Sequence, residues 1–192
     1  MSEIKKLFRE KIRAEIAELD AGYLAESDAG IAKGLLSLAE YKAADAVFAY
    51  ASVGREISTK AIIRRAVEDG KRVYLPRTRG GGEMDFADIS GGLHEARFGI
   101  PEPDAALPAA EPAEGDLIVV PALCCDELGF RMGQGGGYYD RFLARYTGAV
   151  TACLCREALL CEKVPVEWND MRADYVITEA RIIKTELLGA PL

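Results

Sequence analysis

The chain has one histidine, fewer basic than acidic residues and no long apolar run. Lys and Arg number 24 against 31 Asp and Glu, and the resulting net charge of −7 excludes a broad basic surface for nucleic acid. A local basic pocket for a small polyphosphate is compatible with this charge. An apolar segment of about 18 residues, which a membrane-spanning helix needs, is missing. Residues 1–20 are charged and lack the apolar core of a signal peptide. The sequence therefore predicts neither a membrane span nor secretion.

The five cysteines are an odd number in a chain long enough to stabilise itself by burial. They predict reduced thiols in a cytoplasmic protein rather than a disulfide framework. Their spacing lacks the paired C-x2-C pattern of zinc sites, and His94 is the only histidine. We expect structural thiols. A thiol-based metal or redox protein is the alternative, which metal analysis would decide.

Two helices are predicted before the first strand. Apolar residues recur at spacings of three and four from Ile4 to Leu19, as in an amphipathic helix. Ser2 is the expected N-cap and Gly22 the expected end of this helix. A second helix is expected over residues 28–41, with its leucines turned inward.

Strands and helices alternate along the rest of the chain. Strands are expected at 46–51, 72–76, 84–89, 116–120, 150–155 and, as the last strand, 175–178, and helices at 59–69 and 137–146. The segment 84–89 alternates as an edge or antiparallel strand does. We expect a turn at 79–82 and a crossing loop at 99–115.

This pattern predicts one domain over residues 1–192, a three-layer α/β/α Rossmann-like fold with a mostly parallel sheet and helices on both faces. Ligands of such sheets bind outside the carboxyl ends of the strands. The chemically suggestive segments below each begin just after a predicted strand, so we expect them to meet there.

Three basic residues, Lys5, Arg9 and Arg13, are four apart and form a ridge beside the apolar stripe of the first helix. A charge at the border of a buried face can point into a cleft. The alternative is a solvated basic face.

The sharpest motif is the glycine-rich segment 126–140, between the strand at 116–120 and a helix. Its glycines allow positive φ and close approach to a ligand, and amides at a helix start favour an anion such as phosphate. The segment lacks the Lys-Ser/Thr of a Walker loop, and Tyr138 replaces the last glycine of a dinucleotide fingerprint. A tight structural turn is the alternative.

The flanks of the motif strengthen the phosphate interpretation. Arg131 and Arg141 bracket the glycines and could reach phosphate oxygens from both sides. Asp140 could hold a magnesium ion or simply favour the helix dipole. A later loop, 164–171, adds Glu167 and Asp170 as a possible second carboxylate for the metal.

Together these residues resemble the 5-formyltetrahydrofolate cyclo-ligase family over nearly the whole chain. The matching segments are Lys5-x-x-x-Arg9, Gly54-Arg-Glu56-Ile-x-Thr59, Gly99-Ile-Pro-Glu-Pro103, the run from Asp126 through Gly129 and Arg131 to Gly137-Tyr138-Tyr139-Asp140, and Val164-Pro165 with Asn169-Asp170-Met171. The resemblance implies a cytoplasmic ligase, expected as a monomer, that uses ATP and Mg²⁺ to convert 5-formyltetrahydrofolate to 5,10-methenyltetrahydrofolate. The formyl oxygen is expected to attack the γ-phosphate, and N10 then closes the ring as phosphate leaves.

The resemblance also implies site residues. It places ATP at Lys5, Arg9, Arg131, Met132, Gly133, Gln134, Gly135, Gly136, Gly137, Tyr138 and Tyr139. It places the folate at Ala51, Glu56, Gln134, Gly135, Gly136, Gly137 and Tyr138, and the metal at Asp140 and Asp170. Arg131 and Asp140 are the expected catalytic residues. Arg13 has no implied role.

Some positions depart from the family pattern or have two interpretations. Cys125 stands where relatives usually carry Phe, Gln134 where many carry an aromatic or basic residue, and Ala51 is small, which could loosen the pterin pocket. Of Tyr138 and Tyr139 we expect one to stack on a ring and one to pack the helix start. Trp168 could cover the site or be a half-buried anchor. A non-catalytic module that kept the pocket is the second functional hypothesis.

Overall fold

The computed structural model describes residues 2–79, 82–95 and 101–185, and the structural statements below concern these residues. Two predicted features fall partly outside them: residues 80–81 of the expected turn and residues 99–100 of the Gly-Ile-Pro-Glu-Pro segment. The rest of the predicted crossing loop is described, and it contains a short strand.

The main sheet has five parallel strands at its centre and one antiparallel strand at each edge. The strands are β1 (Ala46–Phe48), β2 (Arg72–Thr78), β3 (Met84–Asp88), β6 (Leu117–Val120), β9 (Val150–Leu154), β11 (Tyr175–Ile177) and β12 (Ile182–Lys184). Their order is β12-β11-β9-β6-β1-β2-β3. Only β3 and β12 pair antiparallel to their neighbours. The mostly parallel sheet and the antiparallel edge at 84–89 are therefore confirmed.

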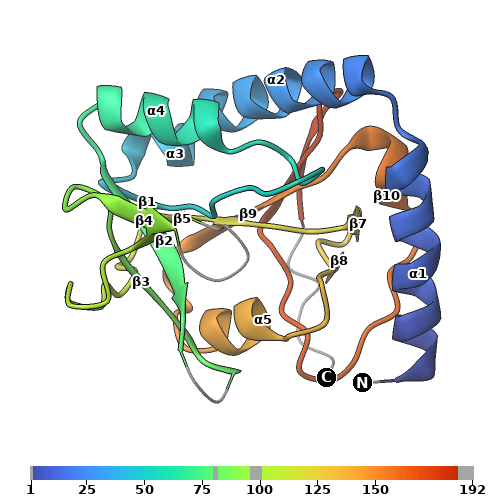
Figure 1. The fold of residues 1–192 in the computed structure, drawn as a ribbon. Helices are drawn as coiled ribbons and strands as arrows, with labels where there is room; N and C mark the ends of the chain where they lie inside the picture. The colour runs from blue at the N-terminus through green and yellow to red at the C-terminus, as the bar shows by residue number, and fades with distance from the viewer. Residues whose placement is uncertain (1, 80–81, 96–100, 186–192) are drawn as a thin grey trace.

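Side chains of β6 alternate between two cores, as the two-residue period of a strand requires. Leu117 and Val119 pack into the core beneath α2 (Ala21–Ser37), α3 (Ala39–Ala43) and α4 (Lys60–Glu68), whereas Ile118 and Val120 pack into the core shared with α5 (Tyr138–Leu143). Helices therefore cover both faces of the sheet, as predicted (Figure 1).

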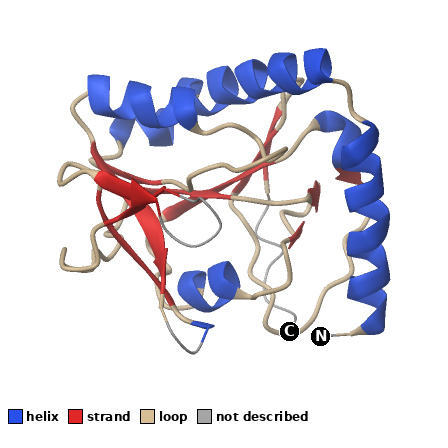
Figure 2. Cartoon of the chain, viewed as in Figure 1, coloured by secondary structure: helices blue, strands red, loops and turns tan. Residues whose placement is uncertain are grey.

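The face of the main sheet that carries α5 is also covered by a smaller sheet and by α1 (Glu3–Glu18) (Figure 2). The small sheet has the order β10 (Leu160–Cys161), β7 (Cys124–Asp126), β8 (Arg131–Met132). Its residues form a third core with Ile12 of α1 and with β9 and β11. Four of the five cysteines are fully buried in this core and all five are free thiols, as predicted. A hairpin of β4 (Leu93–Glu95) and β5 (Pro101–Pro103), and the 3-10 helix η3 (Glu157–Leu159), are the remaining elements.

Several helix boundaries differ from the prediction. The helix expected over residues 28–41 is α2, which begins earlier, followed after Leu38 by the separate short helix α3. Ser2 does cap α1, because its hydroxyl accepts from the Lys5 amide, but Gly22 lies inside α2 rather than ending α1. The chain turns at Leu19, and Asp20 caps α2 by accepting from the Tyr23 amide. The early start of α2 was not predicted because a glycine near a helix start is more typical of a helix end. Gly30 lets α2 pack closely against Glu179, because a Cβ at residue 30 would lie 2.7 Å from Glu179 Cβ.

The strand at 175–178 is not the last one, because β12 follows it and pairs with it through Val176 and Ile183. The helix expected to run to residue 146 ends at Leu143. Thr59 is the N-cap residue of α4, but its hydroxyl donates to the Tyr50 carbonyl instead of accepting from the helix. In the described ranges no helix is both long and apolar enough to cross a membrane.

Candidate active site

A cavity of about 510 Å³ opens at the carboxyl ends of β1, β2 and β6, where the topology predicts a ligand site. Its walls come from α1, the loop after β1, the segment after β6, the glycine-rich loop and the loop 164–171. Every residue that the sequence analysis assigned to ATP, folate or metal lines this cavity. The structure thus brings the predicted residues together, while their individual roles stay predictions.

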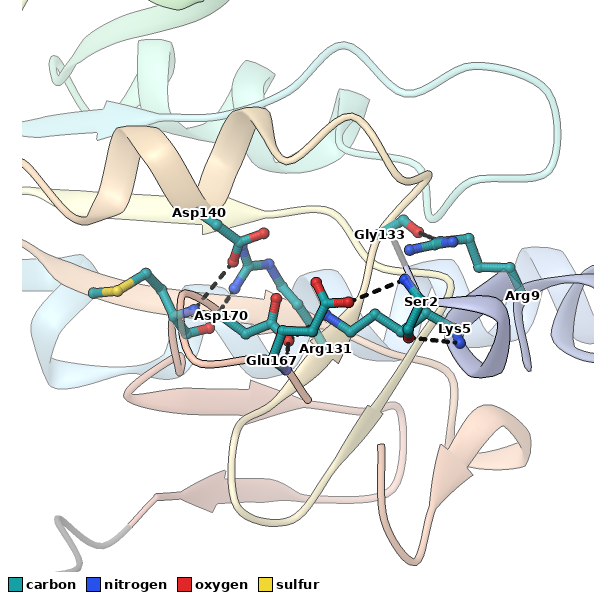
Figure 3. A network of polar contacts seen from close by, with 9 residues as sticks. Ser2, Lys5, Arg9, Arg131, Gly133, Asp140, Glu167 and Asp170 are labelled. Carbon is teal, nitrogen blue, oxygen red and sulfur yellow. Dashed lines mark hydrogen bonds and ion pairs between the residues drawn. The ribbon is translucent and has the colours of Figure 1, made fainter. Parts of the chain in front are cut away.

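Two residues of the basic ridge of α1, Lys5 and Arg9, line the cavity, whereas the exposed Arg13 does not. Lys5 and Arg9 are only 6% and 7% exposed. Lys5 Nζ pairs with Asp170 Oδ2 and lies 3.5 Å from Glu167 Oε2, and Arg9 Nε donates to the Gly133 carbonyl at 2.9 Å (Figure 3). The interpretation of these two residues as a solvated face is therefore wrong. They join the N-terminal helix to two loops from the other half of the chain.

The glycine-rich loop needs glycine at only some of its positions. Gly135 and Gly137 have φ of 104° and 65°, which strain other residues. Gly136 has ordinary φ but no room for a Cβ, which would lie 2.6 Å from the Tyr138 ring. Gly133 has neither a positive φ nor a close neighbour, so the expected use of positive φ is confirmed at Gly135 and Gly137 and is wrong at Gly133 and Gly136. The loop leads into α5, which has six residues.

Arg131 and Asp140 form the central ion pair of the site, with Arg131 Nη2 2.8 Å from Asp140 Oδ1. The buried Arg131 guanidinium also donates to the Met171 carbonyl at 2.6 Å, and the Met171 amide donates to the same Asp140 oxygen at 3.1 Å. These bonds use Oδ1 only. Within the described chain, Asp140 Oδ2 keeps its lone pairs for a ligand.

Arg141 differs from the prediction that it reaches phosphate oxygens. It is exposed, and its Nη2 donates to the Gly82 carbonyl and to the Gly136 carbonyl, the latter at 2.8 Å. Its guanidinium also lies 5.3 Å from the centre of the Tyr138 ring. Arg141 therefore holds the loop, although it still lines the cavity.

The loop 164–171 is fixed by its own acidic residues. Asp170 Oδ2 accepts from the Glu167 amide at 2.6 Å as well as from Lys5. Glu167 Oε1 accepts from the Ser2 amide at 3.1 Å, and this bond together with Lys5 lowers the pKa of Glu167. Trp168 is 97% exposed, so its interpretation as a half-buried anchor is wrong.

Glu56 and Tyr139 also line the cavity. Glu56 Oε2 accepts from the Val53 amide at 3.0 Å, within the loop after β1. Tyr139 packs edge-on against Phe86, with ring centres 6.4 Å apart, as a residue at a helix start does. Its hydroxyl is buried and has no hydrogen-bond partner in the described structure. Burial raises the pKa of Tyr139. Since a buried hydroxyl without a partner is costly, this atom is a candidate ligand contact.

Sequence reasoning missed the side wall formed by Thr78, Met84 and Glu102. These residues reach the cavity through the pairing of β2 with β3 and the neighbouring β5, which local patterns do not reveal.

Sequence reasoning also left Asp126 without a role. The buried Asp126 carboxylate accepts from the amides of Leu128, Phe130 and Val164, so it fixes the turn before the glycine loop and the start of loop 164–171. The sequence feature that could have identified this role is the position of Asp126 three residues before Gly129, since an Asp there often fixes a turn.

Comparison with known proteins identifies the family of this chain. Residues 1–179 match the model of the 5-formyltetrahydrofolate cyclo-ligase family. The 5-formyltetrahydrofolate cyclo-ligase of Mycolicibacterium smegmatis is 38% identical over 148 residues, covering 70% of this chain and 74% of that protein. The Escherichia coli K12 protein of the same name is 31% identical over 146 residues, covering 72% and 80%.

Among solved structures, the Aquifex aeolicus 5,10-methenyltetrahydrofolate synthetase superposes with a TM-score of 0.82 at 25% identity, over 98% of this chain and 96% of that one. A Mycoplasma pneumoniae 5,10-methenyltetrahydrofolate synthetase shares the fold, with a TM-score of 0.74 at 18% identity, over 91% and 98%. The chain belongs to the 5-formyltetrahydrofolate cyclo-ligase family.

Proposed function

We propose that the cavity between α1 and the glycine-rich loop is the active site in which this chain carries out the reaction of its family. The chain is a cyclo-ligase that converts 5-formyltetrahydrofolate to 5,10-methenyltetrahydrofolate, with ATP as co-substrate. The observation that carries the site assignment is the convergence of Lys5, Arg9, Arg131, Asp140 and Asp170 on one cavity.

The polyphosphate would lie between α1 and the loop. Lys5 and Arg9 place two buried cations at this position, and the amides of the glycine-rich loop add neutral donors. Since the chain is acidic overall, these buried cations and backbone donors are the groups that would let an anion of this kind bind here. The folate ring would lie toward Ala51 and Glu56. A carboxylate such as Glu56 can accept paired hydrogen bonds from the amino-pyrimidinone edge of a pterin.

Asp140 and Asp170 would hold Mg²⁺ together with phosphate oxygens and water. Hard carboxylate oxygens are the protein ligands that this ion prefers, and it commonly takes only one or two of them. The residues fit this role, because Asp140 keeps one oxygen outside its ion pair with Arg131 and both carboxylates line the same cavity. Bound there, Mg²⁺ supplies neutralisation of negative charge on the phosphates.

The chemistry needs alignment more than a protein nucleophile. The formyl oxygen attacks the γ-phosphorus, an O–P bond forms, and the bond to ADP breaks. N10 then attacks the activated formyl carbon and loses its proton, and the C–O bond breaks as phosphate leaves. Arg131, held by Asp140 and Met171, presents a fixed guanidinium to the negative charge of the transferring group.

We also propose that the enzyme is a cytoplasmic monomer acting on small molecules. The free, mostly buried thiols support a reducing compartment.

The test is an absorbance assay for the conjugated methenyl product, run on the purified protein with 5-formyltetrahydrofolate, with and without ATP and Mg²⁺. We expect product only when both are present. Ligand-dependent thermal stabilisation without product would instead support the non-catalytic module.

A further inference from the structure

A second cavity of about 210 Å³ adjoins the first one behind Glu56 and Gln134. The two cavities share five lining residues, namely Val53, Glu56, Ala122, Leu123 and Gln134. The remaining wall of the second cavity consists of three arginines, Arg13, Arg55 and Arg156, and of apolar side chains from Ile16, Ile57 and Leu159. The two cavities are therefore neighbours, and the side chains of Glu56 and Gln134 belong to the walls of both.

The arginines give this cavity an excess of positive charge, with Glu56 as the one carboxylate in its wall. Arg156 is neutralised, since its Nη2 lies 2.7 Å from Asp28 Oδ1. Arg13 and Arg55, by contrast, form no ion pair with a carboxylate within residues 2–79, 82–95 and 101–185. Two guanidinium charges thus face this region without a partner of opposite charge.

Both arginines are held in place by neutral acceptors. Arg13 Nη2 donates to Gln134 Oε1 at 2.8 Å, and Arg55 donates to the carbonyls of Ile16 and Leu19 at the end of α1. These bonds use a few of the five N–H donors of each guanidinium and leave the rest for a ligand. Arginine forks match carboxylates in a bidentate way.

We propose that this second cavity binds the glutamate tail of the folate substrate through Arg13 and Arg55. The inference rests on the proposed function. The tail carries two carboxylates at neutral pH and extends from the same molecule whose ring would lie beside Glu56. The cavity shares Glu56 and Gln134 with the active site, and its unpaired cations match the charge of the tail.

The experiment compares two substrates that differ only in the tail, 5-formyltetrahydrofolate and 5-formyltetrahydropteroate, which lacks the glutamate. The quantity measured is kcat/KM for 5-formyltetrahydrofolate divided by kcat/KM for 5-formyltetrahydropteroate. In Arg13→Gln and in Arg55→Gln we expect this ratio to fall by about tenfold, the usual effect of losing a hydrogen bond to a charged group. Lys11→Gln is the matched control. This substitution also removes one positive charge from α1, but Lys11 lines neither cavity.

The ratio separates tail binding from disturbance of the loop. If Arg13 only positions Gln134, both kcat/KM values fall together and the ratio stays at the wild-type value, which would overturn the proposal. A fall of the same size in the Lys11 variant would also overturn it, since a general charge effect would then explain the data. Failure of the proposed function looks different, because the wild-type protein would then turn over neither substrate.

Discussion

Lys5, in the first turn of α1, forms an ion pair with Asp170 in the loop 164–171. The side chains are 8% and 15% exposed, so the charge of Asp170 depends largely on Lys5 for compensation, while Lys5 also lies 3.5 Å from Glu167 Oε2. The pair ties α1 to the loop 164–171 across the mouth of the active site, and it places a cation beside one of the two carboxylates that would hold Mg²⁺.

Replacing Lys5 by Met should cost both stability and activity. Breaking a buried ion pair leaves an uncompensated charge, and for this partly exposed pair we expect a loss of about 2 kcal/mol in the free energy of unfolding. KM for ATP should rise as well. Urea unfolding and steady-state kinetics measure the two effects. Lys6→Met is the control, since the ion pair of Lys6 with Glu3 lies between two exposed side chains, and this variant should change neither quantity.

The hydroxyl of Tyr139 should matter for ligands and not for folding. It is buried without a hydrogen-bond partner in the described structure, so Tyr139→Phe removes no bond and should leave the free energy of unfolding unchanged or raise it by about 1 kcal/mol. If the hydroxyl contacts a substrate, kcat/KM falls. Wild-type kinetics in a variant of unchanged stability would show that the atom has no part in the site.

Tyr139 also predicts a pH dependence. Burial raises its pKa above the ordinary value of 10.0, so the folded protein keeps the phenol neutral where the unfolded chain ionises. Its contribution to stability is fully present below that value and is lost as pH rises above it. Unfolding measured between neutral and alkaline pH should therefore show a smaller alkaline loss in Tyr139→Phe than in the wild type. Equal losses would contradict the assignment of this tyrosine to a buried environment.

Gly137 should be needed for nucleotide binding because of its backbone. Alanine at its φ of 65° is strained, and a Cβ would lie 2.8 Å from Arg141 Nη1. We expect Gly137→Ala to cost about 1 kcal/mol of stability and to raise KM for ATP. Gly70→Ala is the matched control. Gly70 has φ of 74° with open space around it, so it should share the stability loss and spare ATP binding. Equal ATP effects in both variants would contradict the role of the loop.

The sequence predicted the parts of the molecule that local patterns determine. The buried strand at Leu117–Val120 and the cap at Ser2 follow from hydrophobicity and from side-chain chemistry that acts over a few residues. The segment 126–140 identified the family because its order of glycines, tyrosines and acids is specific. The predicted end of the first helix at Gly22 failed because the chain already leaves the helix at Leu19, and Asp20 caps α2 before this glycine is reached.

The contacts between the site residues could not be predicted in the same way. The spacing of Lys5 and Arg9 showed a ridge but not its partners, because Asp170 and Gly133 meet it only through the packing of α1 on the small sheet. Arg141 looked like a phosphate ligand, yet it bonds carbonyls of its own loop and of Gly82. The side wall with Met84 depends on strand pairing, which a single sequence does not encode locally.

The central claim is that Asp140 and Asp170 hold the metal that the phosphates need within this cavity. The most direct measurement is the rate of ATP-dependent methenyl formation in Asp140→Asn, at increasing Mg²⁺ concentrations, beside its free energy of unfolding. Asparagine keeps an oxygen for Arg131, so we expect stability to fall by about 1 to 2 kcal/mol while kcat falls by at least about a hundredfold. Wild-type turnover and an unchanged Mg²⁺ dependence in this variant would contradict the account.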